Sequence, residues 1–169
     1  MNYILDLNIE FEKLFFMVLL PLILTSLVAY FIGFERQKIG KAAGISSHML
    51  VAFASAAIAI MQRLLYEYEI QTLGMQEVQT QRIIAQVLTG IGFIGAGVIL
   101  KEKGSIKGIT TATTIWSSAI IGLIFGSGFL VLGSVVGLFI VVFIFSRDLV
   151  RGFNPFKKEH IDEDLEDHL

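Results

Sequence analysis

The chain has 169 residues, a formal net charge of −2 and no cysteine. Hydrophobic residues make up 54% of it, charged residues make up 17%, and its mean hydropathy is +0.73. A soluble domain of this length is rarely so apolar, and the composition therefore predicts an integral membrane protein. The lack of cysteine excludes disulfides, thiolate metal sites and cysteine nucleophiles.

Apolar runs predict the fold class, because crossing about 30 Å of hydrocarbon takes about 20 residues in a helix. Five runs come close to this length: residues 14–34, 47–66, 82–100, 109–126 and 128–146. We predict an all-α fold, a polytopic transmembrane helical bundle of about five spans. Residues 1–147 would form the membrane domain and 148–169 a short cytoplasmic tail. Because Asp6 and Glu10 replace the basic start of a signal peptide, the first span should be retained.

Basic residues are concentrated in alternate connections between the runs. The richer set is Arg36, Lys38, Lys41, Lys101, Lys103, Lys107, Arg147, Arg151, Lys157 and Lys158. The remaining connections hold only Lys13, Arg63 and Arg82, which are diluted by acidic residues. Positive charge favours the cytoplasmic side, so the pattern predicts the N-terminus outside and the C-terminus in the cytoplasm.

The third run contains GIGFIGAG at residues 90–97. On a helix, Gly90 and Gly97 fall on one side, and Gly92 and Gly95 fall roughly opposite. Small residues allow helices in lipid to approach closely, so we predict a central third span that is packed on both glycine faces. The alternative is a broken helix that aims backbone groups into a polar cavity.

The fourth run carries hydroxyl side chains within about 160° of arc on a helix. They are Thr110, Thr111, Thr113, Thr114, Ser117 and Ser118. Such hydroxyls can donate to carbonyls of their own helix and hold helices together. Alternatively, they can line a hydrated path for a hard cation. The predicted helix-packing or cavity-lining residues are Gly90, Gly92, Gly95, Gly97, Thr110, Thr111, Thr114, Trp116 and Ser117.

Polar residues at the ends of the spans form a candidate functional cluster, namely Glu35, Arg36, Lys41, His48, Arg82 and Gln86. Near an interface, snorkelling or a structural ion pair is the ordinary role of such residues. Glu35 differs because it is an acid at a span boundary within a basic loop, where it can pair with a cation or bind a metal ion.

No catalytic residue, metal ligand set or cofactor site is predicted from the motifs. The sequence shows no nucleophile beside a base, and GIGFIGAG lacks the Gly-Lys-Ser/Thr ending of a phosphate-binding loop. We therefore expect a non-enzymatic protein without a cofactor.

Two segments resemble the signature blocks of the MgtC/SapB family of bacterial inner-membrane proteins. They are GFERQKIGKAAGISSHMLVAFASA at 33–56 and RIIAQVLTGIGFIGAGVILKEKGSIKGITTATTIWSSAIIG at 82–122. Ser46 and Ser47 stand where many members have Arg-Thr, and Thr113 stands where many have alanine. The resemblance implies a multi-pass inner-membrane protein of a short form, without the soluble C-terminal domain of longer members.

The resemblance also implies a function. Several members are induced in low magnesium and are needed for growth there or for survival inside macrophages. A regulator or adaptor is implied, which affects ATP and phosphate balance through membrane partners such as ATP synthase or a sensor kinase, and not through nucleic acid. Smooth helix faces further favour a homodimer. The alternative is a small channel or carrier for a magnesium-related cation or a phosphate-like anion.

Overall fold

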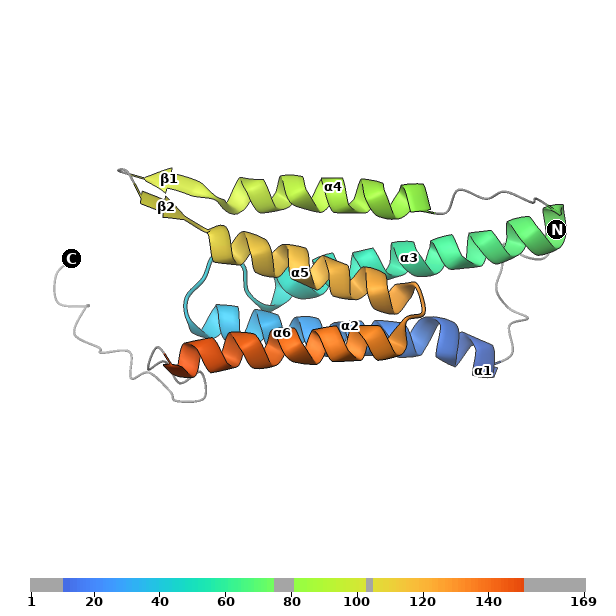
Figure 1. Ribbon diagram of the computed structural model, residues 1–169, viewed down its shortest axis with the longest axis horizontal. Coiled ribbons are helices and arrows are strands. Elements are labelled where there is room, and N and C mark those ends of the chain that lie inside the picture. Colours follow the sequence, from blue (N-terminus) through green and yellow to red (C-terminus); the bar gives the residue numbers. More distant parts are fainter. Residues whose placement is uncertain (1–10, 75–80, 103–104, 151–169) are drawn as a thin grey trace, which may run out of the picture.

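The computed structural model describes residues 11–74, 81–102 and 105–150, and it is a bundle of long helices that run alongside one another (Figure 1). The helical fold class predicted from the apolar runs is confirmed. The predictions for the acidic start, for Lys103 and for most of the tail concern positions outside the described residues.

A single continuous helix from Phe11 to Lys38 begins the bundle, and one of its turns is of the π type. The elements in chain order are α1 (Phe11–Leu14), η1 (Phe15–Leu19), α2 (Leu20–Lys38), α3 (Ile45–Leu73), α4 (Gln81–Val98), β1 (Leu100–Glu102), β2 (Ser105–Lys107), α5 (Ile109–Gly126) and α6 (Leu130–Val150). The strands pair antiparallel, with Leu100 opposite Lys107, in the connection between α4 and α5. The sequence predicts only a basic loop in this connection, so the hairpin is a difference from the prediction.

Four helices of the described chain are long and apolar enough to cross a membrane. They are Phe11–Lys38, Ile45–Ile70, Ile109–Gly126 and Leu130–Val150. The third predicted run gives a shorter apolar helix, Arg82–Val98. Its status as a fifth span, like the orientation in the membrane, therefore stays a prediction.

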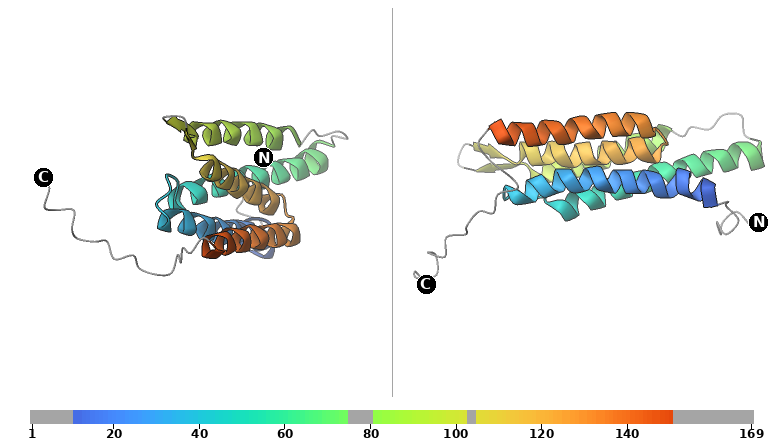
Figure 2. Two further views of the ribbon diagram at one scale, coloured as in Figure 1. Left: turned by 60° about the vertical axis from the view of Figure 1, so that its left-hand side comes forward. Right: turned by 90° about the horizontal axis from the view of Figure 1, so that it is seen from below.

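Helix α5 occupies the centre of the bundle. It packs against α2, α3, α4 and α6, and its interface with α3 is the most extensive in the structure. By contrast, α4 packs on α5 and only slightly on α3. Figures 1 and 2 accordingly show α4 at the edge of the bundle. The prediction of a central third span is wrong.

The glycines of α4 explain this error. A Cβ atom added at Gly90, Gly92 or Gly97 would meet nothing within 4 Å, and one at Gly95 would make an ordinary contact of 3.7 Å with Ala112. Two smooth faces are present, as the sequence indicated, but only the side near Gly95 has a neighbouring helix. The α4 helix is also unbroken from Gln81 to Val98, so the glycines do not interrupt it.

Close helix packing instead uses glycines of α5. A Cβ atom at Gly122 would collide with the carbonyl oxygen of Ala52, and one at Gly126 would collide with that of Ala56. Each helix thus contributes two small residues four positions apart, which lie on one face and let the two backbones approach. This interface between α3 and α5 positions the polar side chains at the hairpin end of the bundle.

Candidate functional site

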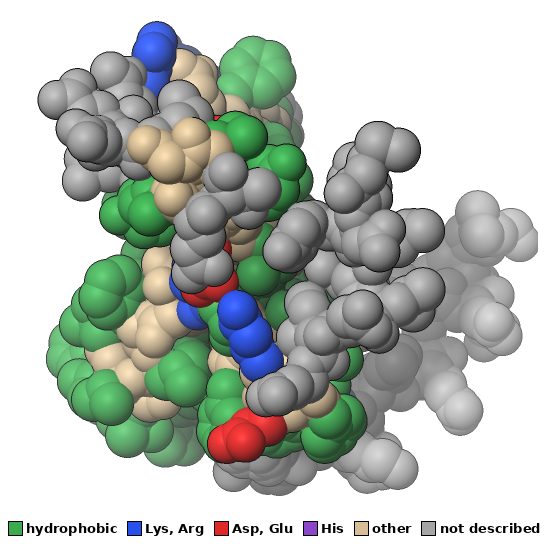
Figure 3. Space-filling model, turned by 90° about the vertical axis from the view of Figure 1, so that its right-hand side faces the viewer, with side chains coloured by type: hydrophobic (Ala, Val, Ile, Leu, Met, Phe, Trp, Pro, Cys, Tyr) green, Lys and Arg blue, Asp and Glu red, His purple; other side chains and the backbone are tan. Residues whose placement is uncertain are grey.

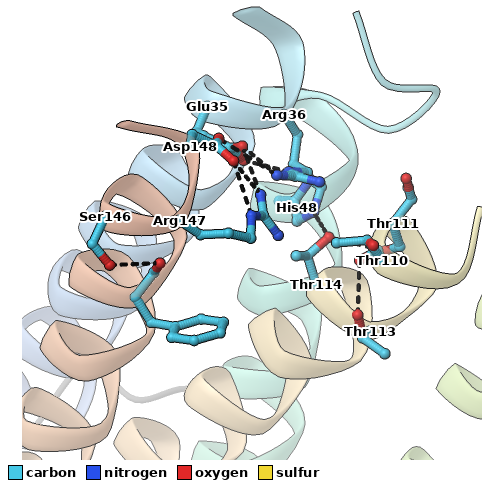
Figure 4. A network of polar contacts seen from close by, with 11 residues as sticks. Glu35, Arg36, His48, Thr110, Thr111, Thr113, Thr114, Ser146, Arg147 and Asp148 are labelled. Carbon is cyan, nitrogen blue, oxygen red and sulfur yellow. Dashed lines mark hydrogen bonds and ion pairs between the residues drawn. The ribbon is translucent and has the colours of Figure 1, made fainter. Parts of the chain in front are cut away.

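Polar side chains from α2, α3, α5 and α6 gather at the end of the bundle next to the hairpin (Figures 1 and 4). The C-terminal turns of α2 and α6 meet there, and the first turns of α3 and α5 lie beside them. The site is therefore built by four chain segments that are far apart in sequence.

The centre of the site is an ion pair between neighbouring residues of α2. Arg36 donates from Nε to Oε2 of Glu35 and from Nη2 to Oε1. The side chains of Glu35 and Arg36 are 0% and 1% exposed. Burying a lone charge costs several kcal/mol, and a two-pronged guanidinium–carboxylate contact offsets much of that cost. Within the GFER sequence, the charge of Glu35 is therefore neutralised by the neighbouring Arg36.

Helix α6 adds a second ion pair to the first. Arg147 donates from Nη2 to Glu35 Oε1 at 3.1 Å, and from Nε and Nη2 to Asp148 Oδ1 at 2.9 and 2.7 Å. Arg36 Nη2 lies 3.8 Å from Asp148 Oδ2, an oxygen that accepts no hydrogen bond from the described residues. We call Glu35, Arg36, Arg147 and Asp148 the ion cluster. Its two carboxylates and two guanidiniums balance in charge and join the ends of α2 and α6.

The contribution of α6 differs from the prediction. The charge pattern predicts Arg147 as a cytoplasmic basic residue and Asp148 as part of the tail, whereas both belong to the ion cluster. The missed signal is helical spacing, because the buried residues Gly133, Gly137, Ile144 and Asp148 recur every four or seven positions along one face of α6. An acid on the inward face of an apolar helix calls for a buried partner.

His48 lies beside the ion cluster and is completely buried. Its Nδ1–H donates to the carbonyl of Gly44 at 2.7 Å, since a carbonyl only accepts, and its Nε2 lies 3.0 Å from Thr114 Oγ1. A neutral imidazole then accepts the Thr114 hydroxyl at Nε2. The carbonyl of Thr111, at 2.9 Å, is the second acceptor within reach of that hydroxyl. His48 thereby joins α3 to α5.

The hydroxyl residues of α5 do not form a single surface. Thr111, Thr114 and Ser118 are buried, whereas Thr110 and Thr113 are exposed. The hydroxyls of Thr113, Ser117 and Ser118 donate to the carbonyls of Thr110, Thr113 and Thr114, at 2.8, 2.8 and 3.0 Å. These three hydroxyls therefore bond within their own helix, which is the first of the two roles predicted for them. Trp116 is 46% exposed.

Of the six residues in the predicted functional cluster, the structure brings Glu35, Arg36 and His48 together. Lys41 is exposed in the turn between α2 and α3. Arg82 and Gln86 are exposed in the first turns of α4, at the opposite end of the bundle. Within the described part of the chain, no three His, Cys, Asp or Glu side chains are grouped so that they could hold a metal ion.

Comparison with known proteins identifies the family. The model of the MgtC family matches residues 22–153, which include every residue of the ion cluster and His48. The chain belongs to the MgtC family. The resemblance carried by the two sequence blocks is thus confirmed.

Several curated relatives align with part of this MgtC family chain. It is 42% identical over 115 residues to "Putative magnesium transporter YhiD" of Escherichia coli K12, covering 68% of this chain and 53% of the relative. It is 37% identical over 119 residues to "Protein MgtC" of Salmonella typhimurium, and the alignment covers 70% of this chain and 47% of the relative. It is 36% identical over 110 residues to "Protein MgtC" of Brucella abortus strain 2308, and the alignment covers 65% of this chain and 42% of the relative. The chain therefore spans about half the length of these relatives. No solved structure matches it.

Proposed function

We propose that the protein is a non-enzymatic regulator or adaptor of the bacterial inner membrane, which supports growth in low magnesium by acting on membrane partners. Family membership supports the link to magnesium, since one relative is named as a magnesium transporter and others as MgtC. The ion cluster is the observation that carries the choice of a regulator over a carrier.

The carboxylate oxygens of Glu35 in the ion cluster already accept hydrogen bonds from arginines. Both carboxylate oxygens of Glu35 accept from Arg36, and one of them also accepts from Arg147. A cation entering this site would have to displace two guanidiniums from a fully buried carboxylate. Such a network is suited to holding α2 and α6 in one arrangement, which a partner can recognise, because breaking one buried pair leaves the other charges uncompensated.

The outward face of α4 is the surface that we propose for the partner. Gln86, Thr89, Gly90 and Gly97 are exposed on it, around a Phe93 side chain that is 83% exposed. Lipid tails favour large apolar side chains, whereas small and polar residues favour contact with another helix. A second copy of this chain is the partner that the smooth helix faces favour. ATP synthase or a sensor kinase are the partners that the family resemblance suggests.

We also propose that α4 is the fifth span and that the hairpin end faces the cytoplasm. The exposed lysines Lys38, Lys41, Lys101 and Lys107 lie at the hairpin end, and Lys13, Arg63 and Arg82 belong to the opposite end. This distribution follows the positive-inside rule with the N-terminus outside.

The second candidate function is a small channel or carrier for a magnesium-related cation or a phosphate-like anion. One observation favours it. The hydroxyl oxygen of Thr25 is buried in α2 and has no hydrogen-bond partner in the described part of the chain. Ser55 and Ser118 add further buried hydroxyls to the bundle interior. Buried hydroxyls can line a hydrated path.

Growth in low magnesium tests the proposed regulator. In a strain that depends on this chain for such growth, Glu35→Gln and Arg36→Gln should abolish growth while the membrane fraction keeps normal amounts of protein. Lys41→Gln is the matched control, because Lys41 lies at the same end but is exposed, and it should grow normally. Full growth of Glu35→Gln would remove Glu35 from the site, and loss of the protein together with growth would make its role purely structural.

Flux measurements separate the two functions. Purified protein in liposomes should give no magnesium or phosphate flux above that of empty vesicles. Ion-selective flux that disappears in Thr114→Val would contradict the regulator and support the carrier.

A further inference from the structure

The first span departs from α-helical geometry directly before a proline. Residues Phe15–Leu19 form a π-helical turn, and Pro21 follows two residues later. In an α-helix the carbonyl of Met17 would accept the backbone N–H of residue 21. Proline has no N–H, so position 21 offers no donor to the carbonyl four residues earlier, that of Met17. It offers none either to the carbonyl five residues earlier, that of Phe16, which would be next in the π pattern that pairs the N–H of Leu20 with the carbonyl of Phe15. Inside a membrane, an unpaired backbone carbonyl costs several kcal/mol.

A side chain from α3 supplies the missing donor. Nη2 of Arg63 donates a hydrogen bond to the carbonyl of Met17. Next to the guanidinium lies Gly128, which has a φ of 92°, and a Cβ at this position would collide with Nη1 of Arg63. The loop between α5 and α6 therefore leaves room for the arginine. Arg63 in turn needs an acceptor, because a charged donor without one is costly away from water.

The helical segment before the proline has little else to hold it. None of the residues in α1 or η1 is buried, and the extensive contacts of this segment are with its own helix. We call Phe11–Leu19 the arm. The arm is also linked to α3 by an ion pair between Lys13 Nζ and Glu67 Oε2 at 3.2 Å, with side chains that are 50% and 31% exposed. Exposed pairs of this kind contribute little.

Figure 3 looks onto this end of the bundle, where acidic and basic side chains lie close together among hydrophobic ones. The end is opposite the ion cluster (Figure 1). At this end, an arginine donates to a backbone carbonyl. At the hairpin end, by contrast, arginines donate to carboxylates.

We propose that Pro21, Met17 and Arg63 form a latch that fixes the arm against α3. Pro21 frees the carbonyl of Met17 and makes the turn deformable, and Arg63 captures that carbonyl. The latch is thus a conformational device: the guanidinium of Arg63 supplies a donor to the carbonyl of Met17, and this carbonyl supplies an acceptor to the guanidinium. When it opens, the arm moves about the π-helical turn while α2 stays packed in the bundle.

The absence of cysteine from the chain allows a direct test with two introduced cysteines. Spin labels at Phe16→Cys on the arm and Tyr66→Cys on α3 replace side chains that are 54% and 42% exposed. Double electron–electron resonance on the full chain in lipid nanodiscs should give a narrow distance distribution. The Arg63→Met variant should broaden and shift it. Adding Pro21→Ala to Arg63→Met should restore a narrow distribution, because residue 21 then donates to the carbonyl of Met17.

The matched control is Lys13→Met, which removes a charge from the arm but leaves the latch intact and should keep the narrow distribution. Thermal unfolding without spin labels gives a second measurement. Arg63→Met should lower the midpoint, since it leaves the carbonyl of Met17 without the guanidinium donor. Adding Pro21→Ala should raise the midpoint above that of Arg63→Met, since residue 21 then has an N–H.

Two outcomes would overturn the latch. An unchanged distance distribution in Arg63→Met would show that this residue does not hold the arm. A double variant as broad as Arg63→Met, or no more stable than Arg63→Met, would show that Arg63 does not replace a donor that Pro21 lacks. If Arg63→Met does not accumulate in the membrane, failure of the double variant to accumulate would overturn it equally.

Discussion

Helices α4 and α5 have the same length, 18 residues, and both are rich in small side chains, yet they occupy opposite positions in the bundle. The glycines of α5 lie against the backbone of α3, while three of the four glycines in GIGFIGAG face open space. A run of glycines makes a helix smooth, but a smooth surface is covered only when a second smooth surface faces it. Ala52 and Ala56 provide that surface for α5. On α4, the uncovered surface is available to a partner.

The largest effect that should separate the two helices comes from leucine at their glycines. Gly122→Leu should lower the free energy of unfolding by about 1–3 kcal/mol or more, because the side chain has to displace the backbone of α3. Gly92→Leu should leave the stability of the single chain almost unchanged. Thermal unfolding in detergent measures both variants. Equal losses would contradict the central position of α5.

Removing a hydroxyl group from one side or the other of α5 should change the free energy of unfolding by an intermediate amount. Thr114→Val removes the partner of His48 Nε2 and leaves a buried nitrogen unpaired, which should cost about 1–3 kcal/mol of unfolding free energy. Thr113→Val changes an exposed hydroxyl that bonds within its own helix, and its effect should stay within about 0.5 kcal/mol. Chemical denaturation of both variants provides the comparison. The division of α5 into a buried and an exposed hydroxyl face would be wrong if the two variants behaved alike.

Alanine at glycine positions should give the smallest effect, with opposite signs on the two helices. Gly90→Ala should stabilise the chain by about 0.5–1 kcal/mol, because alanine favours the helix and its Cβ meets no atom within 4 Å. Gly126→Ala should destabilise it, because the same atom would collide with the Ala56 carbonyl. Unfolding midpoints of the two variants measure the sign. A stabilising Gly126→Ala would contradict the close packing of α3 and α5.

The same contrast explains how much of the site could be predicted. Glu35, Arg36 and His48 stand out in sequence because ionisable residues at the ends of apolar runs are rare, and the structure brings all three together. Lys41, Arg82 and Gln86 have the same sequence signal but stay outside the buried site: Lys41 is exposed at the same end, and Arg82 and Gln86 lie at the opposite end. Position near a span end does not fix the direction of a side chain. Asp148 was missed because it follows the last apolar run, although α6 continues to Val150.

The sequence by itself determined that the chain is a helical membrane protein of the MgtC family, and it located the five long helices to within a few residues of most ends. These properties depend on local quantities, namely the length and hydropathy of each run and the residues of the two signature blocks. Tertiary structure alone decided that α5 is central, that α6 completes the ion cluster and that Arg63 reaches the carbonyl of Met17. Each of these depends on which surfaces of distant segments face one another, and in an apolar environment a polar group is stabilised by whichever partner the packing brings within reach.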